Sequence, residues 1–312
     1  MKVVSAVMRF FVKAVSVCHA NKAYFSSRVI PECGATKKDD VMKLRSFLSG
    51  TKRLLVLSGA GVSTESGIPD YRSAKIGRYS RPKPLIVDHQ EFMHSAGLRR
   101  RYWARNFLEW TWFCKATPNR SHEIIADWEQ KNKLSWLITQ NVDGLHSMAG
   151  SQKVTELHGC RRRVRCMKCK ELFSRDAVQT MMEEQNFSWN ARFLKVSAET
   201  EVNLTEDEEF NFNAPSCPKC GGFMKPDVVF FGDSVPEEIM LFLKSKVHEA
   251  DSMLVLGSSL MVNTGFYFVQ LLKSSDKPLA IVNINETKAD HFADVKISAV
   301  CGEILTAIGC DW

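Results

Sequence analysis

The sequence predicts an α/β fold, built on a doubly wound parallel sheet with helices on both faces. Four short apolar runs carry this prediction, because parallel strands covered on both faces are continuously hydrophobic. The runs lie at residues 53–58, 134–139, 252–257 and 278–284. Helical segments separate them, and strands that alternate with helices form a parallel sheet. We expect this Rossmann-like domain to comprise residues 36–159 and 222–312.

Two insertions are expected in this domain. Residues 75–131 form a helical insertion rich in aromatic and arginine side chains. Residues 160–221 form a small lobe that carries paired cysteines and an acidic stretch at 199–209. The cleft between the two lobes is the natural place for a substrate.

The first apolar run leads directly into GAGVSTESGIPDYR, residues 59–72. Gly59 and Gly61 permit a tight turn and a close approach of a ligand to the backbone. Three hydroxyl side chains are expected to cap a helix whose amides face a phosphate: Ser63, Thr64 and Ser66. Thr64 replaces the third glycine of the dinucleotide fingerprint GxGxxG, so an ordinary turn is the alternative. The extension SGIPDYR favours a nucleotide site.

The second apolar run ends in QNVDGLH, residues 140–146. In doubly wound folds, ligands bind just past the carboxyl ends of strands. Amide and carboxylate side chains there suit ribose hydroxyls and a carboxamide, although a plain polar loop is also compatible. His158 ends the next short strand, and imidazole is the side chain that exchanges a proton near neutral pH. A structural histidine is the alternative.

Two of the chain's motifs are CxxC pairs, Cys166 with Cys169 and Cys217 with Cys220. Together they present four thiolates to one tetrahedral Zn²⁺ and leave no open position for a reactive water. The metal is therefore predicted to be structural. A redox CxxC is the alternative, but it does not explain two copies.

Residues 1–35 are predicted to be a presequence that directs the chain to the mitochondrial matrix. Basic residues recur there, and the first acidic residue is Glu32. Arg9 and Lys13 interrupt the apolar run that a secretory signal would need. A disordered basic tail is the alternative.

The charge balance of the chain points away from nucleic acid as a partner. The net charge is +7, of which residues 1–35 supply +4, and the remaining +3 is mild for a nucleic-acid-binding protein. No apolar run approaches the roughly eighteen residues of a membrane span, so membrane insertion is not expected.

Seven motifs follow one another along the chain: GAGVSTESGIPDYR, TQNVDGLH, ELHG, the paired CxxC, KPDVVFFGD, GSS at 257–259 and NIN at 283–285. Together they resemble the sirtuin family, the NAD-dependent protein-lysine deacylases, from about residue 38 to 308. DYRS, RYWARNF and KPDVVFFGD are similar to the class II mitochondrial (sirtuin-4-like) branch. Tyr71 departs from the family pattern, in which phenylalanine is common at this position.

The resemblance implies removal of an acyl group from lysine, with cleavage of NAD and release of nicotinamide and 2'-O-acyl-ADP-ribose. His158 is then the general base on a ribose hydroxyl, and Asn141 orients the ribose and a water. Val142 and Asp143 hold the carboxamide, and Gln140 touches the ribose hydroxyls. The implied substrates are acylated mitochondrial proteins, and the implied cofactors are NAD and one structural Zn²⁺.

The resemblance also implies further contacts. The remaining NAD-binding residues are expected to be Gly59, Ala60, Gly61, Ser63, Thr64, Ile68, Pro69, Asp70, Tyr71, Arg72, Tyr79, Gly257, Ser258, Ser259, Asn283, Ile284, Asn285 and Cys301. Cys301 is interpreted as a packed thiol beside adenine rather than a nucleophile. An extended segment is expected to line the acyl-lysine tunnel and to pair with the substrate peptide: Val229, Phe230 and Phe231.

Tyr102 and Arg105 are three residues apart and share a face of the expected helix. In the family branch that removes acidic acyl groups, a Tyr-x-x-Arg pair binds the distal carboxylate. We therefore expect carboxylated or bulky acyl groups, lipoyl included, to be preferred over acetyl. A solvated helix face is the alternative.

Three other functions fit parts of the sequence. Mono-ADP-ribosyl transfer from NAD to a protein needs the same pocket and differs only in its product. A zinc-ribbon module that binds nucleic acid would need a basic face with aromatics, for which the candidates are Arg161, Arg162, Arg163 and Arg165. Their position near His158 favours contact with an anionic cofactor or substrate. A dehydrogenase is disfavoured because the ribose-binding acid expected about twenty positions past the glycines is missing, the nearest acid being Asp88.

Overall fold

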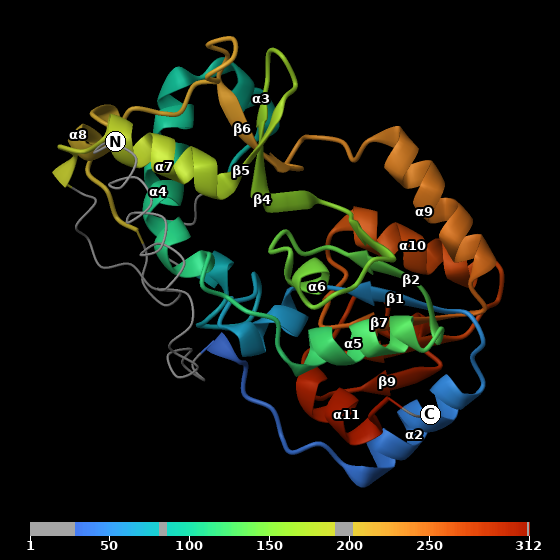
Figure 1. Cartoon of the computed structure of the whole chain (residues 1–312). Coiled ribbons are helices and arrows are strands. Elements are labelled where there is room, and N and C mark those ends of the chain that lie inside the picture. The colour runs from blue at the N-terminus through green and yellow to red at the C-terminus, as the bar shows by residue number, and fades with distance from the viewer. Residues whose placement is uncertain (1–28, 81–85, 191–201, 311) are drawn as a thin grey trace, which may run out of the picture.

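The computed structural model describes residues 29–80, 86–190, 202–310 and 312, arranged in a large and a small lobe (Figure 1). The expected presequence therefore lies mostly outside the described residues. The large lobe is built on a six-stranded sheet of order β3-β2-β1-β7-β8-β9. Its strands are β1 (Leu54–Ser58), β2 (Leu134–Thr139), β3 (Val154–Glu156), β7 (Ser252–Leu256), β8 (Leu279–Val282) and β9 (Val295–Ile297).

Every pairing in this sheet is parallel. From β1 the chain proceeds outward through β2 and β3, and it later returns to the other side of β1 and proceeds outward through β7, β8 and β9. The strand order thus reverses between β1 and β7, which is the switch point where doubly wound folds bind ligands. The predicted fold class is confirmed.

Both faces of the sheet are covered, as the apolar runs predicted. Leu54 and Val56 of β1 belong to the core beneath α2 (Lys38–Ser49), α5 (Arg120–Gln130) and α11 (Cys301–Ile308). Leu55 and Leu57 point to the opposite core, beneath α9 (Glu237–Glu249) and α10 (Asn263–Lys273). All of β1 is buried, which explains why its sequence is continuously apolar rather than alternating.

The small lobe holds an antiparallel sheet of order β5-β4-β6. Its strands are β4 (Gly159–Cys166), β5 (Leu172–Ser174) and β6 (Met224–Val228). The sheet extends past the expected boundary at residue 221, because β6 pairs with β4 along its length. The helices of this lobe are α3 (His89–His94), α4 (Ala96–Phe113), α7 (Arg175–Gln185) and α8 (Glu206–Phe210). No described helix is long and apolar enough to span a bilayer.

The helical insertion expected at 75–131 is divided between the lobes. The apolar side chains of α3 and α4, among them Phe92, Trp103 and Phe107, pack into the core of the small lobe. Ile124, Ile125 and Trp128 of α5 pack instead on the main sheet. The aromatic residues at the C-terminal end of α4, Trp110, Trp112 and Phe113, pack in a separate cluster with Ile68 and Leu145, so α4 connects the small lobe to the large lobe.

The expectation that hydroxyl side chains cap an α-helix after Gly61 is wrong. Ala60–Ser66 forms the 3₁₀ segment η2, and its N-cap Gly59 offers no side chain. Ser63 Oγ donates instead to Asp143, and Thr64 Oγ1 donates to the Gly61 carbonyl. The remaining short elements are η3 (Arg78–Ser80), α6 (Leu145–Met148) and η5 (Asp290–Phe292).

The four cysteines of the two CxxC pairs come together in the small lobe. Their sulfur atoms all lie within 4.8 Å of one another, with Cys166 and Cys220 at 3.5 Å and Cys169 and Cys217 at 3.7 Å. Four sulfurs about 2.3 Å from one Zn²⁺ lie about 3.8 Å apart, so this arrangement fits a tetrahedral site. A metal ion held by these cysteines would link the β4–β5 turn to the loop before β6, which is a structural role.

Replacing Cys217 with serine is expected to remove zinc and loosen the small lobe, because three thiolates do not complete the tetrahedral site. Zinc bound per chain should fall below about a tenth of the wild-type value, and limited proteolysis should cleave within residues 160–228. Cys33→Ser, which changes a thiol outside the cluster, is the matched control. Full zinc content and unchanged proteolysis in Cys217→Ser would contradict the assignment.

Candidate active site

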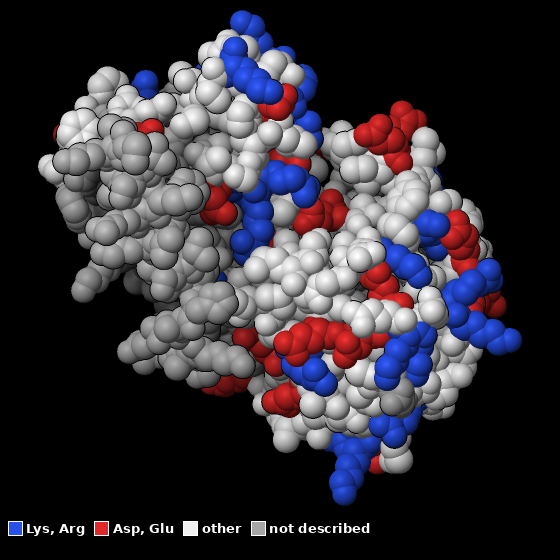
Figure 2. All heavy atoms as spheres, in the orientation of Figure 1, with Lys and Arg blue, Asp and Glu red and all other residues white. Residues whose placement is uncertain are grey.

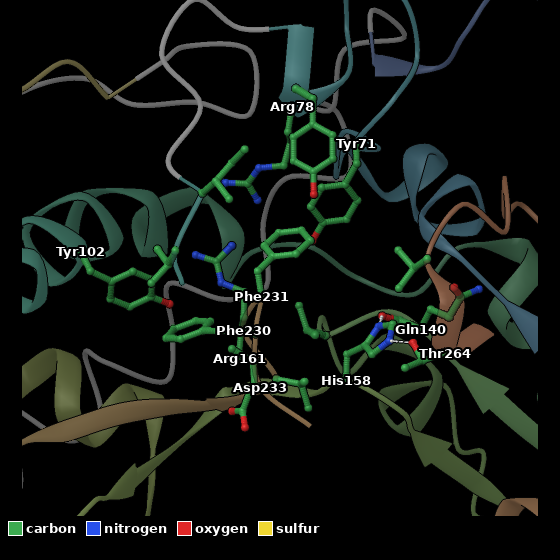
Figure 3. A pocket seen from close by; sticks show the side chains of 18 of the residues that line it. Tyr71, Arg78, Tyr102, Gln140, His158, Arg161, Phe230, Phe231, Asp233 and Thr264 are labelled. Carbon is green, nitrogen blue, oxygen red and sulfur yellow. Dashed lines mark hydrogen bonds between the residues drawn. The ribbon is translucent and has the colours of Figure 1, made fainter. Parts of the chain in front are cut away.

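A cavity of about 670 Å³ lies between the two lobes and is lined by both (Figure 3). The large lobe contributes residues of the 140–142 loop and of the 261–264 loop before α10. The small lobe contributes α4, the start of β4 and the segment 228–233 after β6. Figure 3 shows His158, Gln140 and Thr264 gathered at one end, with Tyr102, Arg78 and Arg161 toward the other.

His158 lines the cavity with both ring nitrogens bonded. Nδ1 lies 3.0 Å from the Gln140 carbonyl oxygen, and Nε2 lies 2.8 Å from Thr264 Oγ1. Burial lowers the pKa of His158, and the bond to the Gln140 carbonyl opposes this only in part. The ring is therefore neutral at physiological pH. Since a carbonyl can only accept, Nδ1 carries the proton and Nε2 presents a lone pair, as a general base requires.

The glycine loop and the QNVD loop meet at the carboxyl ends of β1 and β2. Asn141 Nδ2 donates to the Gly59 carbonyl at 3.0 Å and to Ser63 Oγ at 3.1 Å. Asp143 accepts from Ser63 Oγ at 2.7 Å and from the Leu145 amide at 2.9 Å. Burial raises the pKa of Asp143, while these two donors act in the opposite direction. Two motifs far apart in sequence thus form one polar cluster at the switch point.

A third loop packs directly against the glycine loop. A Cβ on Gly61 would lie 2.9 Å from the Gly257 Cα, so the two backbones touch without room for a side chain. Gly257 also has a positive φ of 58°, which favours glycine. Next to it, Ser258 Oγ accepts from Gln140 Nε2 at 2.7 Å. The GSS motif is therefore hydrogen-bonded to Gln140, the residue whose carbonyl binds His158.

The expected adenosine contacts lie at the same edge of the sheet, outside the described lining of the cavity. Asn283, Ile284 and Asn285 follow β8, and the side-chain Nδ2 of Asn283 donates to the Asn285 carbonyl at 2.7 Å. Cys301 begins α11 and is buried. Burial, with the nearby Glu65, raises the pKa of Cys301 to about 12. Its thiol therefore stays protonated, in agreement with a packed rather than a nucleophilic role.

The segment 68–72 reaches the cavity only with its last two residues, Tyr71 and Arg72. Ile68 and Pro69 are buried, and Asp70 Oδ1 accepts from the amides of Arg72 and Ser73. Arg72 lies over the ring of Tyr79, and both line the cavity with Tyr71. The hydroxyl that distinguishes Tyr71 from phenylalanine thus belongs to a cavity-lining side chain.

Aromatic rings form the wall that the sequence assigned to the acyl-lysine tunnel. Tyr102 packs edge-on against Phe92 and Phe230, and its ring centroid lies 5.4 Å from the centroid of each. Burial raises the pKa of the Tyr102 hydroxyl to about 12. Phe231 is half exposed at the mouth. The Val229 amide donates to the His158 carbonyl at 2.9 Å, which fixes this segment beside the histidine.

Charged side chains occupy the wall formed by α4 and β4. Glu109 accepts from Arg78 at 3.1 Å and from Arg161 at 3.0 Å. Burial opposes ionisation, yet the two guanidiniums outweigh it and lower the pKa of Glu109 to about 2. Arg105 Nε lies 3.3 Å from Glu209 Oε1 of α8, so one residue of the acidic stretch pairs with an arginine of the wall. The described side chains Arg78, Arg161 and Glu109 leave a net charge of +1.

Of the four arginines near the first CxxC pair, Arg161 alone lines the described part of the cavity. Arg162 donates to the Asp143 carbonyl at 2.7 Å. Arg163 and Arg165 both bond to Asp227 instead. On the face shown in Figure 2, basic and acidic side chains are interspersed rather than gathered by sign.

Sequence reasoning missed several lining residues. Asn106 and Glu109 follow Tyr102 and Arg105 at helical spacing, so the periodicity of α4 could have identified them. Arg78 and Thr264 stand in loops or at a helix end, where spacing carries no such signal. They were identifiable only from the structure.

Glu109→Gln is expected to destabilise the protein by about 3 kcal/mol at pH 7, since it leaves the partly buried guanidiniums of Arg78 and Arg161 without their shared carboxylate. The pKa of Glu109 is depressed in the folded state, so its contribution is full above pH 4.5 and is lost as the pH falls toward about 2. The difference in the free energy of unfolding between wild type and variant, measured with urea, should therefore become smaller below pH 4.5. Glu123→Gln, in an exposed pair with Arg120, should change stability by less than about 0.5 kcal/mol.

Comparison with known proteins agrees with this geometry. A model of the Sir2 family matches residues 59–264. The mitochondrial NAD-dependent protein lipoamidases sirtuin-4 of Bos taurus and Homo sapiens are 46% and 44% identical to the chain, over 89% of it and 89% of each relative.

Solved structures agree as well. A Sir2 enzyme with a deacetylated p53 peptide and 3'-O-acetyl-ADP-ribose is 27% identical, with a TM-score of 0.69 over 86% of this chain and 96% of that one. A Sir2–p53 peptide–NAD⁺ complex is 27% identical, with a TM-score of 0.66 over 85% of this chain and 95% of that one. The motifs, the fold and these relatives lead to one conclusion: the chain belongs to the Sir2, or sirtuin, family.

Proposed function

We propose that the chain is an NAD-dependent protein-lysine deacylase, with His158 as its general base. The observation that carries the proposal is a neutral imidazole that lines a cavity beside the switch point of a dinucleotide-binding sheet, with Nε2 as its hydrogen-bond acceptor. The relatives are named lipoamidases, deacylases and deacetylases, which favours acyl removal over mono-ADP-ribosyl transfer to protein.

The chain's own residues supply positioning and one proton transfer. NAD, when bound, supplies a ribose carbon that takes the acyl oxygen as nicotinamide departs. His158 Nε2 accepts the proton of a ribose hydroxyl, and its Nδ1–H remains on the Gln140 carbonyl, which stabilises the resulting imidazolium. Ser63 hydrogen-bonds to both Asn141 and Asp143 and fixes their side chains at the edge of the sheet. Their remaining hydrogen-bonding atoms are therefore already oriented before a ligand binds.

His158→Ala is expected to reduce kcat by at least about 100-fold, because the loss of a general base typically costs a factor of 10²–10⁴. Binding of NAD should change by less than about threefold, since the backbone loops at the switch point remain. His94→Ala, at the exposed end of α3, serves as the control. The measurement is turnover of an acyl-lysine peptide with product identification by mass. A variant with near-normal kcat would contradict the assignment of the base.

The walls of the cavity support a preference for carboxylated or bulky acyl groups over acetyl. The described cavity has room for far more than two carbon atoms. Its α4 wall holds aromatic surface from Tyr102 and Phe230 and a net positive set of guanidiniums around Glu109. Arg105 lines the same wall beside Glu209. A long acyl chain with a distal anion complements both features.

Arg105→Met is expected to lower the ratio of kcat/KM for a carboxylated acyl peptide to that for an acetyl peptide by at least about fivefold, the loss of one charged hydrogen bond. Arg101→Met is the matched control, because Arg101 lies at the same 3.3 Å from Glu209 but is 45% exposed, against 7% for Arg105. An unchanged ratio in Arg105→Met refutes its role. If the ratio falls in Arg161→Met alone, the distal anion of the acyl group lies instead beside Arg161, the partner of Glu109.

The proposed substrates are acylated proteins of the mitochondrion. The bovine and human relatives are named mitochondrial. The matrix is the compartment we propose, on the basis of the basic residues and the absence of acids before Glu32 in the sequence.

A further inference from the structure

The two hydrogen bonds of His158 have different consequences for catalysis. The bond from Nδ1 to the Gln140 carbonyl fixes the tautomer. The bond at Nε2 is then one in which the Thr264 hydroxyl donates to the single lone pair of the ring, at 2.8 Å. This lone pair is the one that the proposed mechanism assigns to a ribose hydroxyl. Two hydroxyl groups therefore require the same acceptor.

The fold leaves Thr264 little freedom to lie elsewhere. Thr264 stands in the first turn of α10. The next residue, Gly265, packs so closely against Gln140 that a Cβ on Gly265 would lie 2.4 Å from Gln140 Oε1. The loop before it contains Leu260, a fully buried residue with a left-handed φ of 57°. Ser258 Oγ ties this loop to Gln140 and accepts from the Leu260 amide. The same loop therefore positions the ring and the hydroxyl.

The Thr264 hydroxyl is not needed to cap its own helix. The N-cap of α10 is Val262, and the amides of Gly265 and Phe266 bond to the Val262 carbonyl. A plain surface position is also excluded, because Thr264 is partly buried and lines the cavity. Figure 3 shows its side chain directed at the His158 ring.

We propose that Thr264 is a positioning residue that holds Nε2 of His158 toward the cavity and competes with the substrate ribose for its lone pair. The inference rests on the proposed function, in which His158 is the base. During binding, the Thr264 O–H releases Nε2 and the ribose O–H takes its place. No covalent bond changes in this exchange. The proton moves from ribose oxygen to Nε2 only in the later chemical step.

The competition has a measurable consequence for affinity. A hydrogen bond inside a protein is worth about 0.5–1.5 kcal/mol net, which is a factor of about 2 to 10 in binding. Thr264→Val keeps the shape of the side chain and removes the donor. It is therefore expected to bind ADP-ribose about 2 to 10 times more tightly than wild type. Thr264→Ser keeps the hydroxyl and should restore the wild-type affinity.

The test is a double-mutant cycle on the full chain, with ADP-ribose binding measured by calorimetry in wild type, Thr264→Val, His158→Ala and the double variant. The tightening caused by Thr264→Val should vanish when His158 is absent. In steady-state kinetics, the KM for NAD should fall in Thr264→Val and return to the wild-type value in Thr264→Ser. Thr180→Val, on α7 and far from the lining, controls for the loss of a threonine hydroxyl.

Three results would overturn the inference: equal tightening with and without His158, unchanged affinity in Thr264→Val, or weaker binding in that variant. The last would mean that Thr264 supports the ribose directly. Thermal melting reports whether each variant folds, and Thr264→Ala provides the same comparison if the valine variant does not. Calorimetry needs no turnover. A chain that shows the coupling but does not deacylate any peptide would therefore refute the proposed function and leave the competition intact.

Discussion

The contact between two glycine loops at the carboxyl ends of β1 and β7 determines how the rest of the site is arranged. Gly61 and Gly257 touch backbone to backbone, and no side chain fits between them. This closeness brings Ser258 to Gln140, and the Gln140 carbonyl in turn receives Nδ1–H of His158. The orientation of the base is thus linked, through two hydrogen bonds, to the packing of backbone at the switch point. A change at either glycine would act on catalysis without touching a reacting atom.

The small lobe gives this site its second wall without taking part in the chemistry. Its four cysteines lie in positions that fit one structural zinc, and its β4 begins immediately after His158. The α4 helix is anchored in the core of this lobe and carries Tyr102, Arg105 and Glu109 to the cavity. In the proposed function, the stability of the small lobe and the selectivity for the acyl group are therefore physically connected, although the proposed base belongs to the other lobe.

Much of the fold and part of the site could be predicted from the sequence. The apolar runs identified four of the six parallel strands because burial on both faces removes alternation, and the two CxxC pairs identified the metal-binding cluster. The short edge strand β9 lacked such a signal, since Val295 and Lys296 are only partly buried. The hydroxyls of η2 were misassigned because the sequence does not reveal that Asp143 would compete for Ser63.

The partners of the charged residues were the least predictable part. Arg105 was singled out by its spacing from Tyr102, but its ion pair with Glu209 joins residues about a hundred positions apart in the chain. Thr264 meets His158 across a similar separation. Pairings of this kind depend on how two loops pack, and no local pattern encodes them. The sequence therefore located the functional segments better than the interactions between them.

The pairing of Arg105 with Glu209 has one more implication. Glu209 belongs to α8, in the long spacer between the two CxxC pairs, so a segment between the metal-ligand pairs supplies a counterion to the wall of the cavity. A change at Glu209 would therefore alter the charge of the wall at a point far along the chain from His158. Under the proposed function, the charge that selects the acyl group is thus set by a different segment of the chain from the one that holds the proposed base.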